Sequence, residues 1–144
     1  MKDRHNANIL LDKQGRLIHI DFGFMLGGSP GSIAFESAPF KLTREYADVL
    51  GGPQDPRWHE FRDMVVRGFE VLNRPRHRRR LLDLLSVSIS EAPGKPALLK
   101  AFDERLAHAG SHPRHALQLV DDSFNNYRTT MYDKYQKKRN NIAA

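Results

Sequence analysis

The first residues of this chain carry the side chains best suited to chemistry. Asn8 stands before one short apolar run and Asp21 stands after another, so a hairpin between the two runs would bring both residues to its open end. Opposite Cβ atoms on paired strands lie roughly 5 Å apart. An amide oxygen and a carboxylate at that separation suit Mg²⁺, which takes hard oxygen ligands and keeps water and substrate phosphates as the rest of its shell. The pattern predicts a site for a nucleotide and its metal.

A possible acid and base lie close to the predicted metal site. Asp3, Arg4 and His5 precede Asn8 by a few residues, which places a carboxylate and an imidazole beside the same metal. A hydroxyl that attacks a γ-phosphate needs a nearby group to orient it and to receive its proton. After Asp21 and Phe22, Gly23 lets the chain turn away without a Cβ clash.

The elements that must position these residues follow from the apolar pattern. The runs Ile9-Leu10-Leu11 and Leu17-Ile18-His19-Ile20 flank a polar, glycine-containing stretch and predict a β-hairpin. Residues 24–40 are rich in Gly, Ser and Pro and predict a loop. Helical spacing begins beyond Lys41 and continues to the end of the chain.

Helix boundaries are marked by capping residues and prolines. Thr43 can cap a short helix that Gly51-Gly52 ends, Asp55-Pro56 opens a longer helix, and Pro75 opens the next. We expect the apolar residues of the second and third of these helices to be buried, and two or three further helices to follow. These residues are Trp58, Phe61, Val65, Gly68, Phe69 and Leu72 in one helix, and Leu81, Leu82, Leu84, Leu85 and Ile89 in the other. The fold class is therefore α+β and mostly α, with one hairpin, a loop and five or six helices.

Composition narrows the choice of partner. The 144 residues include 23 Lys and Arg against 17 Asp and Glu, and the net charge of +6 favours an anionic partner such as nucleic acid, an acidic membrane surface or a phosphorylated ligand. The absence of Cys excludes disulfides, thiolate metal sites and cysteine nucleophiles. No apolar run approaches the roughly 20 residues that a transmembrane helix needs.

Two ordered motifs resemble those of a known enzyme family. Asp3-Arg4-His5-Asn6-Ala7-Asn8 and His19-Ile20-Asp21-Phe22-Gly23 resemble the catalytic and metal-binding loops of the phosphoinositide 3-/4-kinase superfamily. Protein kinases order the first motif differently, as H-R-D-x-x-x-x-N. Further segments are similar to the type III beta phosphatidylinositol 4-kinases, closely over residues 1–52 and more weakly to the tail. They include Phe40-Lys41-Leu42-Thr43, Asp48-Val49-Leu50-Gly51-Gly52 and Thr129-Thr130-Met131-Tyr132-Asp133.

The resemblance implies a role for each motif residue. Asn8 and Asp21 would bind Mg²⁺ or Mn²⁺, and Phe22 and Gly23 would complete the ATP-binding motif. Asp3 and His5 would act on the acceptor hydroxyl, and either could take its proton. A neutral imidazole suits a base, whereas an ionised carboxylate would mainly orient the hydroxyl. We expect Arg4 to be structural, paired with a carboxylate such as that of Asp21 or with the loop backbone.

The same resemblance divides the chain and suggests its substrate. Residues 1–23 would hold the catalytic loop, hairpin and metal motif, residues 24–41 the activation loop, and residues 42–144 the helical part of a kinase C-terminal lobe. The loop from Phe24 has no Lys or Arg before Lys41, and plain phosphatidylinositol fits such a loop better than a headgroup with extra phosphates. Its apolar residues could touch lipid or pack against the helices.

Two basic segments and four histidines lie outside these motifs. Arg74 to Arg80 could bind nucleic acid or acidic lipid, or form a solvated helix face. Tyr127, Met131 and Tyr135 recur at helical spacing beside Lys and Arg, which suits a membrane interface or ordinary packing. His59, His108, His112 and His115 show no metal-binding spacing and are interpreted as incidental surface residues.

The sequence lacks a phosphate-binding glycine loop and a strand-borne lysine. We therefore expect a fragment or truncated product whose N-terminal lobe, the required partner, is missing, and which is inactive by itself. By resemblance, the complete enzyme would be cytoplasmic and peripheral on intracellular membranes such as the Golgi. The alternatives are a fragment of a related protein kinase, an inactive kinase-like interaction piece, or a basic helical module that binds nucleic acid, although nucleic acid is not expected as a partner.

Overall fold

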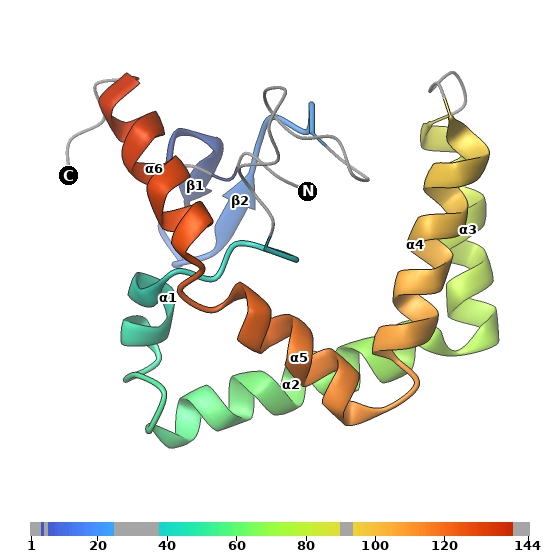
Figure 1. Cartoon of the computed structure of the whole chain (residues 1–144), viewed down its shortest axis with the longest axis horizontal. Helices are drawn as coiled ribbons and strands as arrows, with labels where there is room; N and C mark the ends of the chain where they lie inside the picture. Colours follow the sequence, from blue (N-terminus) through green and yellow to red (C-terminus); the bar gives the residue numbers. More distant parts are fainter. Residues whose placement is uncertain (1–3, 5, 25–37, 90–93, 140–144) are drawn as a thin grey trace. The chain divides into compact units, whose positions relative to one another are not determined.

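The computed structural model describes residues 4, 6–24, 38–89 and 94–139 (Figure 1). In this part of the chain one two-stranded antiparallel sheet and six α-helices form, as the sequence predicts. The fold class is thus mostly α with one hairpin. The elements are η1 (Asn6–Asn8), β1 (Ile9–Leu11), β2 (Leu17–His19), α1 (Arg44–Val49), α2 (Pro56–Asn73), α3 (Pro75–Ser88), α4 (Lys95–Ala109), α5 (Pro113–Ser123) and α6 (Tyr127–Arg139).

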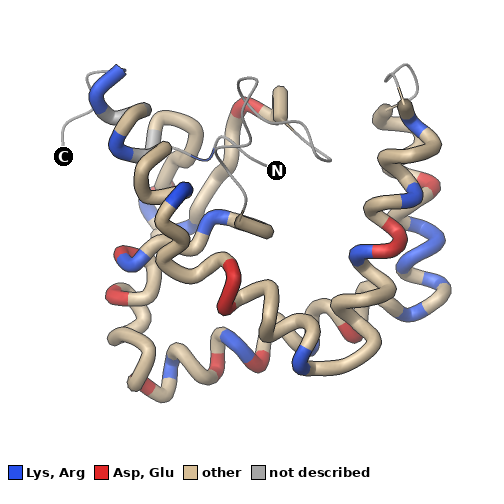
Figure 2. Tube along the Cα trace, in the orientation of Figure 1, with Lys and Arg blue, Asp and Glu red and all other residues tan. Residues whose placement is uncertain are grey.

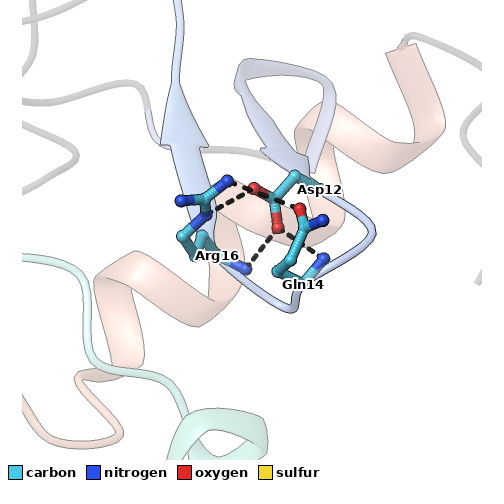
Figure 3. A network of polar contacts seen from close by, with 3 residues as sticks. All are labelled: Asp12, Gln14 and Arg16. Carbon is cyan, nitrogen blue, oxygen red and sulfur yellow. Dashed lines mark hydrogen bonds and ion pairs between the residues drawn. The ribbon is translucent and has the colours of Figure 1, made fainter.

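The hairpin turn is organised by one carboxylate (Figure 3). Asp12 accepts hydrogen bonds from the backbone N–H groups of Gln14 (2.9 Å) and Arg16 (2.8 Å) and from Nε of Arg16 (2.6 Å). These bonds to Arg16 and Gln14 hold the pKa of the Asp12 carboxyl below its ordinary value. Gly15 takes a φ of 78°, a conformation that costs glycine little. The turn fixes the register that pairs Ile9 with His19 and Leu11 with Leu17.

Helix α2 begins where the sequence predicts. The carboxylate of Asp55 caps the helix by accepting the backbone N–H of Arg57 at 2.9 Å, and Pro56 occupies the first turn, where its missing N–H costs nothing. The guanidinium of Arg57 also donates to Asp55, and this side-chain bond, followed by the backbone bond, lowers the pKa of Asp55 to about 2. Pro75 likewise occupies the first turn of α3, but the N-cap residue Arg74 makes no side-chain capping bond.

The chain divides into two compact units. The first comprises residues 1–46 and 122–144. In it, Leu42 forms a parallel bridge with Phe124, and the carbonyl of Leu42 accepts the N–H of Asn125 at 2.9 Å. The buried hydroxyl of Ser123 accepts the N–H of Phe40 at 3.2 Å. These contacts tie the segment after the predicted loop to the chain between α5 and α6.

The second unit comprises residues 47–121, in which α2, α3 and α4 pack against one another. Helices α2 and α4 approach closely at Gly110, where an added Cβ would lie 2.6 Å from the carbonyl oxygen of Phe69 and 2.3 Å from the Cβ of Asn73. The ring of Trp58 is buried and lies 5.5 Å from that of Phe61. The other buried apolar residues of this unit are Ala47, Leu106, Ala109, Ala116 and Val120.

Two predictions of burial were wrong. In α2 only Trp58 of the predicted stripe is fully buried, and Leu72 is 38% exposed. In α3 no residue is fully buried, and Leu84 is 57% exposed. The physical reason is that α3 packs on α2 and α4 along one side, so leucines spaced around the helix cannot all reach that side.

Candidate functional site

Arg4 ties the two motifs together. Its side chain is buried, and its Nη1 donates to the carbonyl oxygen of Ile20 at 2.6 Å and approaches that of Asn8 at 3.4 Å. Its Nη2 donates to the carbonyl oxygen of Asp21. The guanidinium carbon lies 5.9 Å from the centre of the Phe22 ring, within the range of a cation–π contact. Arg4 thus contacts the loop backbone, which is one of the two partners that the sequence predicts for it.

The backbone of Asn8 and that of Asp21 therefore meet at the open end of the hairpin. The N–H of Ile20 donates to the carbonyl of Asn8 at 3.1 Å, which extends the strand pairing by one residue beyond Ile9 and His19. Asp21 follows directly, and its carbonyl shares the guanidinium of Arg4 with that of Asn8. One rigid planar cation thus fixes the spacing of both backbones.

Asp21 bends the chain away from the hairpin. Its φ is 57°, in the left-handed region that L-residues rarely adopt and that Asp tolerates better than most. Its Oδ1 accepts the N–H of Gly23 at 3.2 Å, and a Cβ at Gly23 would lie 3.3 Å from the same oxygen. Asp21, Phe22 and Gly23 are all exposed.

The donor set at this end fits a hard divalent cation. Asn8, which is buried, carries an amide oxygen, and Asp21 carries an exposed carboxylate that is open to an incoming ligand. In the described residues, no group of three or more His, Asp or Glu side chains is arranged to hold a metal ion. Mg²⁺ commonly takes water and phosphate oxygens as further ligands.

Some predicted site residues lie outside the described residues. They are Asp3, His5 and residues 25–37 of the predicted activation loop. Phe24 and Lys41, which flank that loop, are both partly buried. Lys41 directly precedes Leu42, whose contacts with Phe124 and Asn125 anchor this end of the loop.

Sequence reasoning missed a cluster of histidines between α4 and α5. The rings of His108 and His115 stack with centroids 4.1 Å apart, and the ring of His112 lies 5.9 Å from that of His115. Nδ1 of His115 lies 3.0 Å from Oγ of Ser111 and 3.1 Å from the carbonyl oxygen of His108. No sequence signal predicts this cluster, because the tight turn between the helices brings the residues together.

The chain belongs to the phosphatidylinositol 3- and 4-kinase family, whose model matches residues 1–91. The matched residues include both motifs, the hairpin between them and helices α1 to α3. This finding confirms the resemblance that the motifs indicate.

Individual relatives match nearly the whole chain. It is 38% identical over 151 residues to "Phosphatidylinositol 4-kinase" of Dictyostelium discoideum, covering 99% of this chain and 12% of that protein. It is 41% identical over 152 residues to "Probable phosphatidylinositol 4-kinase STT4 homolog" of Encephalitozoon cuniculi, covering 99% of this chain and 10% of that protein. It is 38% identical over 153 residues to "Phosphatidylinositol 4-kinase beta 1" of Arabidopsis thaliana, covering 99% and 14%. The chain thus spans 10 to 14% of the length of these relatives, which include a beta type as the sequence indicates.

Proposed function

We propose that this chain forms the C-terminal part of the catalytic domain of a phosphatidylinositol 4-kinase. The reaction would transfer the γ-phosphate of ATP to a hydroxyl of the inositol headgroup of phosphatidylinositol. The observation that carries the proposal is the contact of Arg4 with the carbonyls of Asn8, Ile20 and Asp21, which joins the two kinase motifs of a family member. The named relatives are 4-kinases, and this favours that activity over protein phosphorylation or nucleic-acid binding.

Asn8 and Asp21 would hold the metal, and Phe22 and Gly23 would shape the turn beside the nucleotide. Bound Mg²⁺ or Mn²⁺ would supply positive charge to the phosphates of ATP. The chain's own contribution is orientation. Arg4 fixes the backbone on both sides, and the bond from Gly23 N–H to Oδ1 of Asp21 limits rotation of the carboxylate.

Asp3 and His5 would act on the acceptor hydroxyl. They adjoin Arg4 in the sequence, and the side chain of Arg4 contacts the loop backbone of the second motif. One of the pair would orient the hydroxyl and the other would accept its proton. Phe24 and Lys41 would bound the loop that presents the lipid, within the divisions 1–23, 24–41 and 42–144 given by the sequence.

Contact with a membrane surface follows from the substrate, and α6 supports it. Tyr127, Met131 and Tyr135 are 74%, 45% and 56% exposed, which favours contact with a membrane interface over packing within the described residues. An exposed aromatic and apolar stripe beside Lys and Arg suits the interface of an anionic bilayer. Within the described ranges, no helix has the length and apolar character needed to cross a membrane. We therefore propose peripheral association with intracellular membranes, the Golgi among them, and a nucleotide-binding N-terminal lobe as partner.

The proposal can be tested with a chimaera. This chain replaces the matching segment of the Dictyostelium discoideum relative, with which it aligns over 99% of its length. Phosphorylation of phosphatidylinositol vesicles is measured with ATP and Mg²⁺, and the position of the new phosphate is identified. We expect phosphatidylinositol 4-phosphate. Since removal of a metal ligand costs the transition state several kcal/mol, Asp21→Asn should lower turnover at least about a hundredfold.

Arg16→Leu is the matched control for this assay. Arg16 lies in the same hairpin, is exposed, and bonds only within the turn in the contacts described above. Its replacement should leave turnover within about twofold. A folded chimaera that phosphorylates peptides but not the lipid, or that is equally active with Asp21→Asn, would refute the proposal.

A further inference from the structure

The arginines of α3 fall into two groups. Arg78 is directed toward α4, where its Nε donates to Oδ1 of Asp103 at 2.5 Å and its Nη2 donates to Oδ2 at 3.0 Å. It therefore has a structural role between two helices. Arg76, Arg79 and Arg80 are exposed, and within the described ranges none of them makes a hydrogen bond or ion pair. Figure 2 shows Lys and Arg positions gathered along the first half of this helix.

The exposed arginines share one side of α3 with exposed apolar residues. Successive steps of four, four and three residues lead from Arg76 through Arg80 and Leu84 to Val87, which places all four along one stripe of the helix. Leu84 and Val87 are 57% and 76% exposed. We call this stripe, together with the adjoining Arg79, the outer face of α3. Within α3 the acidic residue is Asp83, four residues after Arg79 and three after Arg80, so the three arginines outnumber the acid on this helix.

The combination of charge and apolar surface discriminates between anionic partners. Nucleic acid offers phosphates but no apolar medium for Leu84 and Val87, and recognition of single strands would call for aromatic side chains that this face lacks. An anionic bilayer offers both, because its headgroup phosphates lie directly above hydrocarbon. Guanidinium groups bind such phosphates well.

We propose that the outer face of α3 binds the surface of anionic lipid bilayers. Three arginines supply the attraction, and the two aliphatic side chains beyond them insert at the headgroup boundary. This surface is distinct from the loop and the α6 stripe of the proposed function. Binding here requires neither ATP nor phosphotransfer, so it succeeds or fails independently of the kinase proposal.

The test is co-sedimentation of the 144-residue chain with vesicles of phosphatidylcholine alone or with added phosphatidylserine. One variant carries Arg76→Gln, Arg79→Gln and Arg80→Gln. A base near an anionic surface strengthens binding by about 1 kcal/mol, roughly fivefold, so the triple variant should bind anionic vesicles about a hundredfold more weakly. Raising the salt concentration should narrow this difference, because exposed charges are screened.

The matched control removes three exposed positive charges from other elements, with Lys13→Gln, Arg67→Gln and Arg114→Gln. It has the same net charge as the test variant and should keep most of the binding. Circular dichroism checks that both variants are folded. Equal losses in the two variants, or no loss in either, would overturn the proposal.

A second variant tests the apolar half without any change of charge. Leu84→Ser with Val87→Ser should weaken binding to anionic vesicles by about tenfold, since the two side chains lose their burial in the boundary region. Binding of duplex DNA and of single-stranded RNA is measured in parallel. If the triple arginine variant loses affinity for a nucleic acid but not for vesicles, or if the serine pair binds vesicles as tightly as the wild type, the inference is wrong.

Discussion

The N-terminal hairpin and the helical unit of residues 47–121 are stabilised in opposite ways. At the hairpin, main-chain carbonyls converge on the guanidinium of Arg4, while large apolar side chains such as Leu11 and Ile18 are 68% and 47% exposed. In the helical unit, helices meet through side chains, with Arg78 bound to Asp103 and Gly110 lying against α2. The described contacts that fix the backbone of the site are polar, and they join Arg4 to residues 4, 16 and 17 positions away.

The difference shows how the backbone of a site can be positioned by polar contacts in place of apolar packing. A buried guanidinium bound to carbonyl oxygens fixes the positions of individual backbone groups. Packing between helices fixes the position of one whole helix against another. We expect the two regions to respond differently to substitution. A single change at Arg4 should loosen the whole site, and changes between the helices should lower stability in proportion to local packing.

The largest effect is expected from Arg4→Leu. The variant removes a charged donor from the carbonyls of Ile20 and Asp21 and leaves these groups without it, at a cost of roughly 3 kcal/mol or more in local stability. Amide hydrogen exchange should show faster exchange at Ile20, whose N–H bonds to Asn8, with little change in α2 to α4. Arg16→Leu is the control in the same hairpin, and equal exchange in the two variants would contradict the role given to Arg4.

A pair of glycines tests close packing in the helical unit. Gly110→Ala would place a Cβ 2.6 Å from a backbone oxygen of α2, so it should lower the free energy of unfolding by about 1 to 3 kcal/mol. At Gly68, on α2, an added Cβ meets nothing within 4 Å. Gly68→Ala should therefore raise that free energy by about 0.5 to 1 kcal/mol through better helix propensity. Chemical denaturation measures both, and changes of the same sign would refute the assigned contact.

The ion pair between α3 and α4 should have a smaller effect. Arg78→Ala removes two charge-assisted bonds to a partly exposed carboxylate, which should cost about 1 to 2 kcal/mol. Arg79→Ala, on the exposed side of the same helix, should stay within about 0.5 kcal/mol of the wild type. A double-mutant cycle with Asp103→Asn isolates the coupling, and a coupling near zero would count against the pair.

The smallest effect on stability is expected from the Asp55 cap of α2. Because the pKa of Asp55 falls from 3.8 to about 2 on folding, its ionised form stabilises the helix fully above pH 4, and this contribution fades as the pH drops toward 2. Asp55→Asn keeps a capping side chain but has no proton to bind. The difference in melting temperature between wild type and variant should shrink over that interval. A difference that is constant with pH would show that the charge has no part in the cap.

Local signals in the sequence were enough to predict the hairpin and the starts of α1, α2 and α3. The polar turn between Leu11 and Leu17 and the Asp55-Pro56 pair act within a few residues, and both appear where the pattern places them. The two motifs likewise identify Asn8 and Asp21, because their order and interval carry the information. Their roles in metal binding remain a prediction.

Features that depend on contacts between helices and loops could not be predicted from local sequence signals. The leucines of α3 are too evenly spread to show which side packs, so their burial was wrongly predicted. The stacking of His108 on His115 depends on the turn between α4 and α5. For Arg4, the sequence left two partners open, since carbonyl groups are present at every position and only the folded chain shows which of them converge.

The left-handed backbone conformation at Asp21 also bears on how related sequences can lose activity. Asn or Gly could take over the bend, while neither would restore the negative charge. If Asp21 binds the metal as proposed, a relative with Asn or Gly here could lose phosphate transfer and still keep the hairpin. In such relatives the backbone geometry would be kept after the activity is lost. The residue at position 21 would then indicate activity better than a superposition of backbones.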